Sequence, residues 1–236
     1  NKEPLISIIL PTYNHEQFLR KAIQSVIDQT YNNWELIIID NYSTDNTHNT
    51  VKSYIDNRIV YLKIQNNGII AASRNAGIYE SKGLYIAFLD ADDWWLPNKL
   101  KECIKYIKDD NYDLLYHDLF IVERHNQIKF KKLAHTRKLN LPIFNDLLLN
   151  GNAILNSSVL VRKTIIQDIG FLSCDKNKVT WEDYDCWLRI SKISNRFLYI
   201  SKPLGYYWTA GGNMTNPDRD LNNACSIFNY YIKGTY

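Results

Sequence analysis

The chain has 236 residues, which is long enough for one large domain with a substantial core. Its 28 basic and 25 acidic residues leave a net charge of +3, too small to indicate binding to nucleic acid. Its four cysteines include no CxxC pair, which argues against a zinc site and fits a reducing compartment. No apolar run approaches the ~20 residues that cross a bilayer, so we expect a soluble, cytoplasmic protein.

The first hundred residues alternate between short apolar runs and segments with helical spacing. Strands are predicted at 5–10, 35–40, 58–64 and 84–90, and helices at 16–29, from 43–47 to about 55, at 71–81 and from 97 onward. This alternation predicts an α/β protein with a mostly parallel central sheet and helices on both faces.

The second half of the chain is less regular. We expect strands at 113–122, 157–163 and 196–201, a basic loop at 129–138, and helices at 143–151, from 163 to about 169, and at 181–193. There is no internal repeat and no linker rich in Pro, Gly or Ser. We therefore predict one domain over residues 1–236, with functional halves at about 1–100 and about 101–236.

Polar residues gather directly after each of the first four predicted strands. These clusters are Pro11 to Asn14, Asp40 to Asp45, Asn66 to Gly68, and Asp90 to Asp93. Ligands of open parallel sheets bind beyond the carboxyl ends of the strands. A single cluster could equally be a turn or a helix cap, but the four together predict a binding site at one edge of the sheet.

The stretch FLDADDWWLP places Asp90 and Asp92 close together. Two nearby carboxylates need a cation between them or a raised pKa, and Mg²⁺ and Mn²⁺ share such oxygens with substrate phosphates. No GxGxxG or GxxxxGK[ST] loop is present, which argues against dinucleotide and Walker-type sites. Arg74 is therefore a candidate phosphate partner, with a surface salt bridge as the alternative.

A second acidic cluster, Trp181-Glu182-Asp183, opens the predicted helix at 181–193. Thr180 and Asp183 have the spacing of a capping box, which is one interpretation. The other is that Asp183, on the same helix face as Cys186 and Trp187, lies at the edge of the apolar face. A carboxylate there could take a proton from a hydroxyl.

Five sequence pieces in order resemble the family 2 glycosyltransferases of GT-A fold. They are PTYN, the Asp40 turn with Asp45, NxGxxxxSRNxG, FLDADDWWLP and WEDYDCWLR, and they extend over about residues 5 to 210. The resemblance implies a Rossmann-like sheet and a bacterial, inverting enzyme. Such an enzyme moves a sugar from a nucleotide-diphospho-sugar, with UDP as the default, to a hydroxyl of a glycan or lipid-linked saccharide.

The resemblance also implies residue roles. The base pocket would be Pro11, Thr12 and Tyr13 with Asn14, and Asp40 would bind the base edge with help from Asp45. Asn67, Gly68 and Arg74 would flank the nucleotide and diphosphate, and Asp90 with Ala91 would contact ribose or sugar. Asp92 would bind Mn²⁺ or Mg²⁺, Asp183 would be the general base, and Glu182 would orient the acceptor. Trp181 and Trp208 would form the acceptor side.

Two features depart from the family pattern. Many relatives have a Tyr-Arg-x-His-like segment near the C-terminal end, whereas residues 206–215 read YYWTAGGNMT, which suggests a mobile loop over the donor. The acidic turn reads Asp40-Asn41 where an Asp pair is frequent.

The sequence also bears on two other functions and one possible partner. A nucleotidyltransferase would need a Gly-rich basic loop that PTYNHEQF lacks. A degenerate nucleotide- or sugar-binding module would lack carboxylates that are present, namely Asp90, Asp92 and Asp183. The basic loop at 129–138 is either solvated or in peripheral contact with anionic lipid at the inner face of the membrane.

Overall fold

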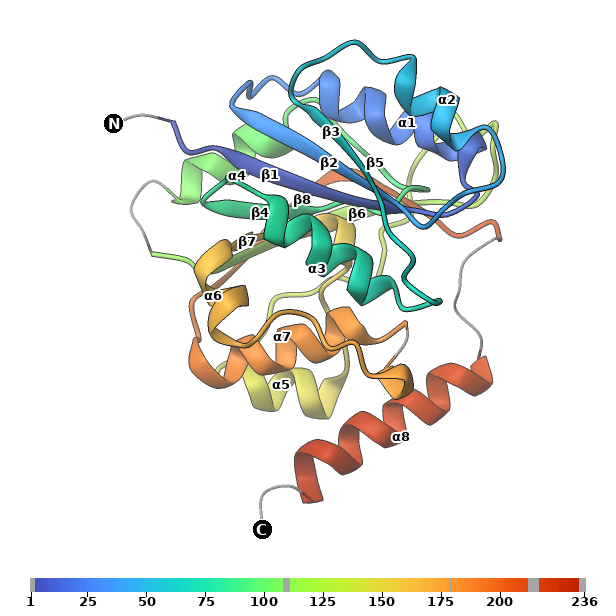
Figure 1. The fold of residues 1–236 in the computed structure, drawn as a ribbon. Coiled ribbons are helices and arrows are strands. Elements are labelled where there is room, and N and C mark those ends of the chain that lie inside the picture. Colours follow the sequence, from blue (N-terminus) through green and yellow to red (C-terminus); the bar gives the residue numbers. More distant parts are fainter. Residues whose placement is uncertain (1–2, 108–110, 179, 212–216, 234–236) are drawn as a thin grey trace.

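The structure is a computed structural model that describes residues 3–107, 111–178, 180–211 and 217–233 (Figure 1). Its strands are β1 (Ile6–Thr12), β2 (Trp34–Asp40), β3 (Ile59–Lys63), β4 (Tyr85–Phe88), β5 (Trp94–Trp95), β6 (Leu114–Val122), β7 (Leu160–Arg162) and β8 (Phe197–Trp208). Its α-helices are α1 (Glu16–Ile27), α2 (Thr47–Lys52), α3 (Ile70–Glu80), α4 (Lys99–Ile107), α5 (Ile143–Asn150), α6 (Lys163–Asp168), α7 (Glu182–Ile193) and α8 (Pro217–Lys233).

The strands form one sheet in the order β3-β2-β1-β4-β7-β6-β8-β5. The pairs β1–β2, β1–β4, β2–β3 and β6–β8 are parallel, whereas β7 is antiparallel to both neighbours and β5 is antiparallel to β8. This arrangement confirms the predicted α/β fold with a mostly parallel sheet. The parallel strands β1, β2 and β4 end at the same edge.

Side chains of the sheet alternate between two cores. Ile8 and Leu10 belong to the core that also holds buried residues of α1 and α4, and Ile9 belongs to the core shared with α3, α5 and α7. Figure 1 shows α1 and α2 on one side of the sheet and α3, α5 and α7 on the other. The expectation of helices on both faces is therefore confirmed.

Helix α3 packs closely on the sheet at Gly77. A Cβ atom at this position would lie 2.7 Å from Cδ1 of Ile39 and 3.0 Å from Cγ2 of Ile9, closer than side chains tolerate. Arg74 precedes Gly77 by three residues and so lies on the same face of α3. The glycine thus brings Arg74 down against the edge of the sheet.

Several expected elements differ in the structure. The strand expected at 157–163 is a 3₁₀ turn at Asn156–Ser158 followed by β7, and the last strand runs on to residue 208. Neither β5 nor α8 was predicted. Residues 206–208, expected in a mobile loop, are instead held in β8, where Tyr206 pairs with Trp94 across the sheet. Residues 212–216 of that expected loop lie outside the described residues.

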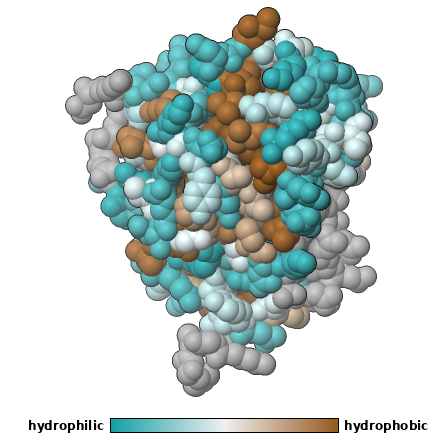
Figure 2. All heavy atoms as spheres, in the orientation of Figure 1, coloured by the Kyte–Doolittle hydropathy of each residue, from teal (hydrophilic) through white to brown (hydrophobic). Residues whose placement is uncertain are grey.

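Within the described ranges, no helix has both the length and the apolarity needed to cross a membrane. Figure 2 shows hydrophobic side chains in a band down the middle of one face, with hydrophilic side chains on both sides. Among the described residues on this face, the apolar side chains therefore form a narrow strip.

Candidate active site

A pocket of about 640 Å³ lies at the carboxyl ends of β1, β2 and β4. It brings together most of the residues predicted for the site, namely Pro11, Thr12, Tyr13, Gly68, Arg74, Asp90, Ala91, Asp92, Glu182 and Asp183. They come from segments that are far apart in the sequence. The sheet edge therefore assembles one site from both halves of the chain.

Asp40 does not line this pocket. Its carboxylate is fully buried and accepts hydrogen bonds from the Ser43 backbone N–H at 2.8 Å and from the hydroxyls of Ser43 and Tyr61, each at 2.5 Å. The neighbouring residue, Asn41, lines the pocket. Asp40 thus stabilises the turn after β2, and a contact with a base would require its fully buried carboxylate to become accessible.

Asn14 and Asp45 also lie outside the pocket lining, where they join two turns. Asn14 has a left-handed backbone with φ of 52°; its N–H donates to Ser43 Oγ at 2.9 Å, and its Oδ1 accepts from the Thr44 N–H at 2.8 Å. Asp45 Oδ2 accepts from the Glu16 N–H at 3.0 Å. The turn after β1 is therefore fixed to the turn after β2.

The turn after β3 is built on consecutive left-handed residues, Asn67 at φ 54° and Gly68 at φ 79°. The side chain of Asn66 accepts a hydrogen bond from the Gly68 N–H at 2.9 Å, and the Asn66 N–H donates to Asn41 Oδ1 at 2.9 Å. Gly68 lines the pocket, whereas Asn67 is exposed outside it.

The carboxylates of Asp90, Asp92 and Asp93 lie on a turn rather than on a strand. Strand β4 ends at Phe88, and the Asp93 N–H donates to the Asp90 carbonyl at 3.0 Å. Strand alternation is therefore not what aligns Asp90 and Asp92, although both line the pocket. Asp93 points inward instead, where its Oδ1 accepts from the Trp208 N–H at 2.9 Å. Its pKa is raised well above the usual value by burial and by Asp92 and Asp90.

Arg74 is buried between two carboxylates. One terminal nitrogen donates to Asp90 Oδ1 at 2.7 Å, and the other pairs with Glu182 Oε1. Asn156 Nδ2 also donates to Asp90 Oδ1, at 3.0 Å. The alternative of a surface salt bridge is wrong. Arg74 joins the carboxylates of the two halves, and a phosphate would have to compete with both of them.

Asp183 lies in the first turn of α7 and lines the pocket. The capping box is not formed, because the first turn has no side-chain cap and Asp183 Oδ1 accepts from the Tyr184 N–H at 2.7 Å. Burial and the neighbouring Glu182 raise the pKa of Asp183 to about 7, and Arg74 limits the rise. Such a carboxylate is poised to accept a proton near neutral pH.

The chemistry of the turn after β4 suits a hard cation that also binds substrate. Burial and the nearby Asp90 raise the pKa of Asp92 to about 6. The described residues contain no group of three or more His, Cys, Asp or Glu side chains that could hold a metal by themselves. Asp90 and Asp92 are the pocket residues of this turn that could hold such a cation, and its other ligands would then have to come from substrate phosphates.

The two tryptophans expected on the acceptor side lie in different places. Trp181 lines a second cavity of about 370 Å³, together with apolar side chains such as Leu148 and Ile227. Trp208 is buried, packs at 5.0 Å from the Phe18 ring, and lines neither cavity. The indole of Trp208 thus belongs to a small apolar core, which corrects its predicted role.

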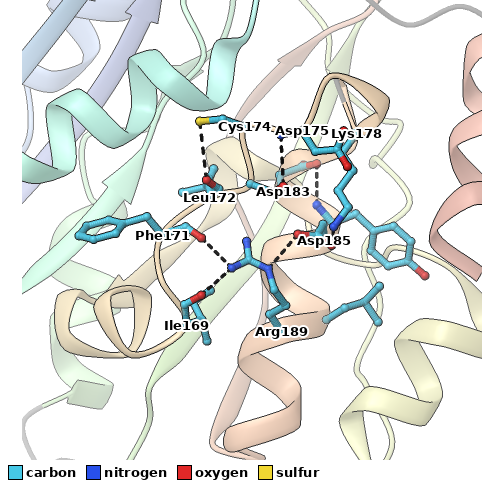
Figure 3. Close-up of polar contacts among 12 residues, drawn as sticks. Ile169, Phe171, Leu172, Cys174, Asp175, Lys178, Asp183, Asp185 and Arg189 are labelled. Atoms are coloured by element: carbon cyan, nitrogen blue, oxygen red, sulfur yellow. Dashed lines mark hydrogen bonds and ion pairs between the residues drawn. The ribbon is translucent and has the colours of Figure 1, made fainter. Parts of the chain in front are cut away.

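A buried ionic cluster holds α7 in place (Figure 3). Asp185 is fully buried and accepts from Lys178 Nζ at 2.8 Å, Arg189 Nε at 2.8 Å and the Tyr231 hydroxyl at 2.9 Å. Arg189 also donates to two carbonyl groups of the segment before α7, at 2.8 and 2.7 Å. The cluster joins the segment before α7 to α7 and α8. Its central residue, Asp185, follows Asp183 by two positions.

Several pocket residues were not predicted, among them His15, Ser73, Asn156 and Tyr207, whereas Asn41 lies in the predicted polar cluster after β2. His15 and Ser73 adjoin or lie within the motifs and could have been included on that ground. Asn156 and Tyr207 carry no local signal, because only the sheet order brings them to the pocket.

The fold and the pocket together define a protein of the nucleotide-sugar transferase class. The profile of Glycosyl transferase family 2 matches residues 7–170. The chain belongs to this family and is a glycosyltransferase.

Curated relatives point the same way. The chain is 35% identical, over 81% of its length and 71% of the relative's, to the Escherichia coli UDP-Glc:alpha-D-GlcNAc-diphosphoundecaprenol beta-1,3-glucosyltransferase WfgD. It is 32% identical, over 79% of its length and 70% of the relative's, to the E. coli enzyme WfaP, which has the same descriptive name. Both relatives are hexosyltransferases.

Solved structures share the fold. Staphylococcus aureus TarS in complex with UDP-GlcNAc superposes with a TM-score of 0.70 at 23% identity, over 88% of this chain and 59% of that one. The mannosyltransferase PcManGT from Pyrobaculum calidifontis, in complex with GDP-Man and Mn²⁺, has a TM-score of 0.70 at 16% identity, over 100% of this chain and 65% of that one.

Proposed function

We propose that this glycosyltransferase moves a hexose from a UDP-sugar to a hydroxyl of a lipid-linked saccharide, with inversion at the anomeric carbon. The observation that carries the proposal is the pocket at the sheet edge, which Asp90 and Asp92 line from the predicted nucleotide-sugar-binding half and Asp183 from the predicted acceptor-binding half. The names of the E. coli relatives support the donor nucleotide and the acceptor class.

In the proposed reaction, the carboxylate of Asp183 accepts the proton of the acceptor hydroxyl. The hydroxyl oxygen forms a bond to the anomeric carbon as the bond from that carbon to the diphosphate oxygen breaks, and UDP leaves with the electron pair. Arg74 keeps Glu182 and Asp90 in place through an ion pair with each. A divalent ion at Asp92 would neutralise the charge of the departing diphosphate.

The donor proposal is tested by thermal shift with UDP, GDP, CMP and dTDP, each with and without Mn²⁺. A ligand that binds only the native state raises the melting temperature. We expect a shift with UDP that depends on Mn²⁺ and is lost in Asp92→Ala. If no nucleotide shifts the wild-type protein, the chain is a degenerate module and the donor proposal fails.

The acceptor proposal carries an expectation about location. Lys129 and Lys131 are exposed in the basic loop, and Ile128 beside them is 86% exposed. Cationic and apolar groups together favour an anionic lipid surface. We expect sedimentation with vesicles containing phosphatidylglycerol at low salt, and release at high salt. A protein that stays in the supernatant at low salt contradicts peripheral contact.

A further inference from the structure

The lining of the pocket is rich in carboxylates, which repel an anionic ligand. Asp90, Asp92, Glu182 and Asp183 all contribute carboxylates to its lining. Among the described residues of the lining, only Arg74 and His15 carry basic side chains. Both terminal nitrogens of Arg74 are already paired with carboxylates. His15 is therefore the basic side chain of the lining that forms no ion pair with a carboxylate among the residues that the structure describes.

The backbone holds His15 in a fixed position. It lies between β1 and α1, directly after the left-handed Asn14, whose backbone and side chain are bonded to the turn after β2. On the other side, the Glu16 N–H is bonded to Asp45. The residues on either side of His15 are thus both anchored to the neighbouring turn.

The imidazole of His15 is half-buried. It contacts the Phe18 ring in an edge-to-face arrangement, with 6.0 Å between the ring centres. Neither ring nitrogen has a hydrogen-bond partner among the residues the structure describes, although the side chain lines the pocket. Burial lowers the pKa of His15, while Asp90 and Asp45 counteract this effect from nearby. A neutral imidazole retains one N–H to donate.

We infer that His15 donates a hydrogen bond to a diphosphate oxygen of the bound nucleotide-sugar. This inference rests on the proposed function, because it concerns the donor of that reaction. The backing by Phe18 and the anchored turn mean that the ring needs little reorganisation when the ligand binds. His15 would thus bind the diphosphate leaving group directly, whereas Asp92 on the same pocket lining would bind it through the divalent ion.

The test compares uridine with UDP in the presence of Mn²⁺, by calorimetry on the full chain. A hydrogen bond to a charged acceptor is among the stronger kinds. We expect His15→Ala to weaken UDP binding about tenfold, which is about 1.4 kcal/mol, and to leave uridine binding unchanged. His15→Gln, which keeps an N–H donor, should recover part of the loss.

His125→Ala is the matched control, because His125 stacks on the same Phe18 ring at 5.6 Å but does not line the pocket. It should bind UDP as the wild type does. Equal losses for uridine and UDP in His15→Ala would show a general structural role and overturn the inference, as would unchanged UDP binding. If the wild type bound neither ligand, the proposed function itself would fail, and that result is separate from any effect of the variant.

Discussion

A single ion pair, between Arg74 and Glu182, connects distant parts of this chain next to Asp183. Arg74 and Glu182 are 108 positions apart in the sequence, and both are buried at their contact. Removing one member of a buried pair leaves an uncompensated charge, so each depends on the other. The proposed base therefore lies beside an ion pair that exists only when the whole fold is assembled.

The raised pKa of Asp183, about 7, predicts how activity depends on pH. The charged groups that face it are Glu182 on α7, Arg74 on α3 and Asp90 on the turn after β4. Below pH 7 the carboxyl is protonated and cannot accept a proton, so kcat should rise as pH increases through about 7 and then level off. The measurement is kcat against pH at saturating substrates.

Asp183→Asn is the companion variant. It should lower kcat by about 10² to 10⁴ and abolish the rise, while UDP binding stays unchanged. A wild-type profile that is flat around neutrality, or a variant that keeps most of its turnover, would exclude Asp183 as the base.

The carboxylates of the site were predictable because their motifs are local in the sequence. Asp90, Asp92 and Asp183 all line the pocket, as expected. Asp40 and Trp208 do not, because their surroundings are made by partners that spacing cannot reveal: Tyr61 bonds to Asp40, and Phe18 packs on Trp208.

At the scale of elements, helix α7 depends on its ionic cluster. Asp185→Ala would leave Lys178 and Arg189 without their buried partner, and we expect the free energy of unfolding to fall by about 3 kcal/mol. Urea unfolding measures the change. Glu123→Ala is the control, because its pair with Lys132 is exposed and should contribute less than about 1 kcal/mol. Similar losses in both variants would contradict a special role for the cluster.

The elements of the first half could be predicted from the sequence, since each buried strand and each amphipathic helix has its own periodicity. The short strand β5 could not, because its two residues form a strand only by pairing with β8. The antiparallel direction of β7 was equally hidden, since a three-residue strand gives no sign of its neighbours. Local sequence patterns therefore predict the elements that have their own periodicity. They do not predict a short strand such as β5, which forms only by pairing with another strand.

At the scale of the molecule, Asp93 links the turn after β4 to the end of β8. Asp93→Ala removes the acceptor of the buried Trp208 N–H and should destabilise the protein by about 1 to 3 kcal/mol. Asp93→Asn keeps an acceptor oxygen and should lose less. Melting temperatures of the two variants check this order. If the asparagine variant were the less stable of the two, the hydrogen bond would not be what Asp93 contributes.

Strand β8 lies between β6 and β5 in the sheet, and this position affects how the protein folds during its synthesis. Asp93 leaves the ribosome 115 residues before Trp208, its hydrogen-bond partner. Until then β5 has no strand to pair with and β6 has an open edge, which is the kind of surface that promotes aggregation in a nascent chain. The turn after β4 therefore gains the contact that fixes it only after Trp208 has been synthesised.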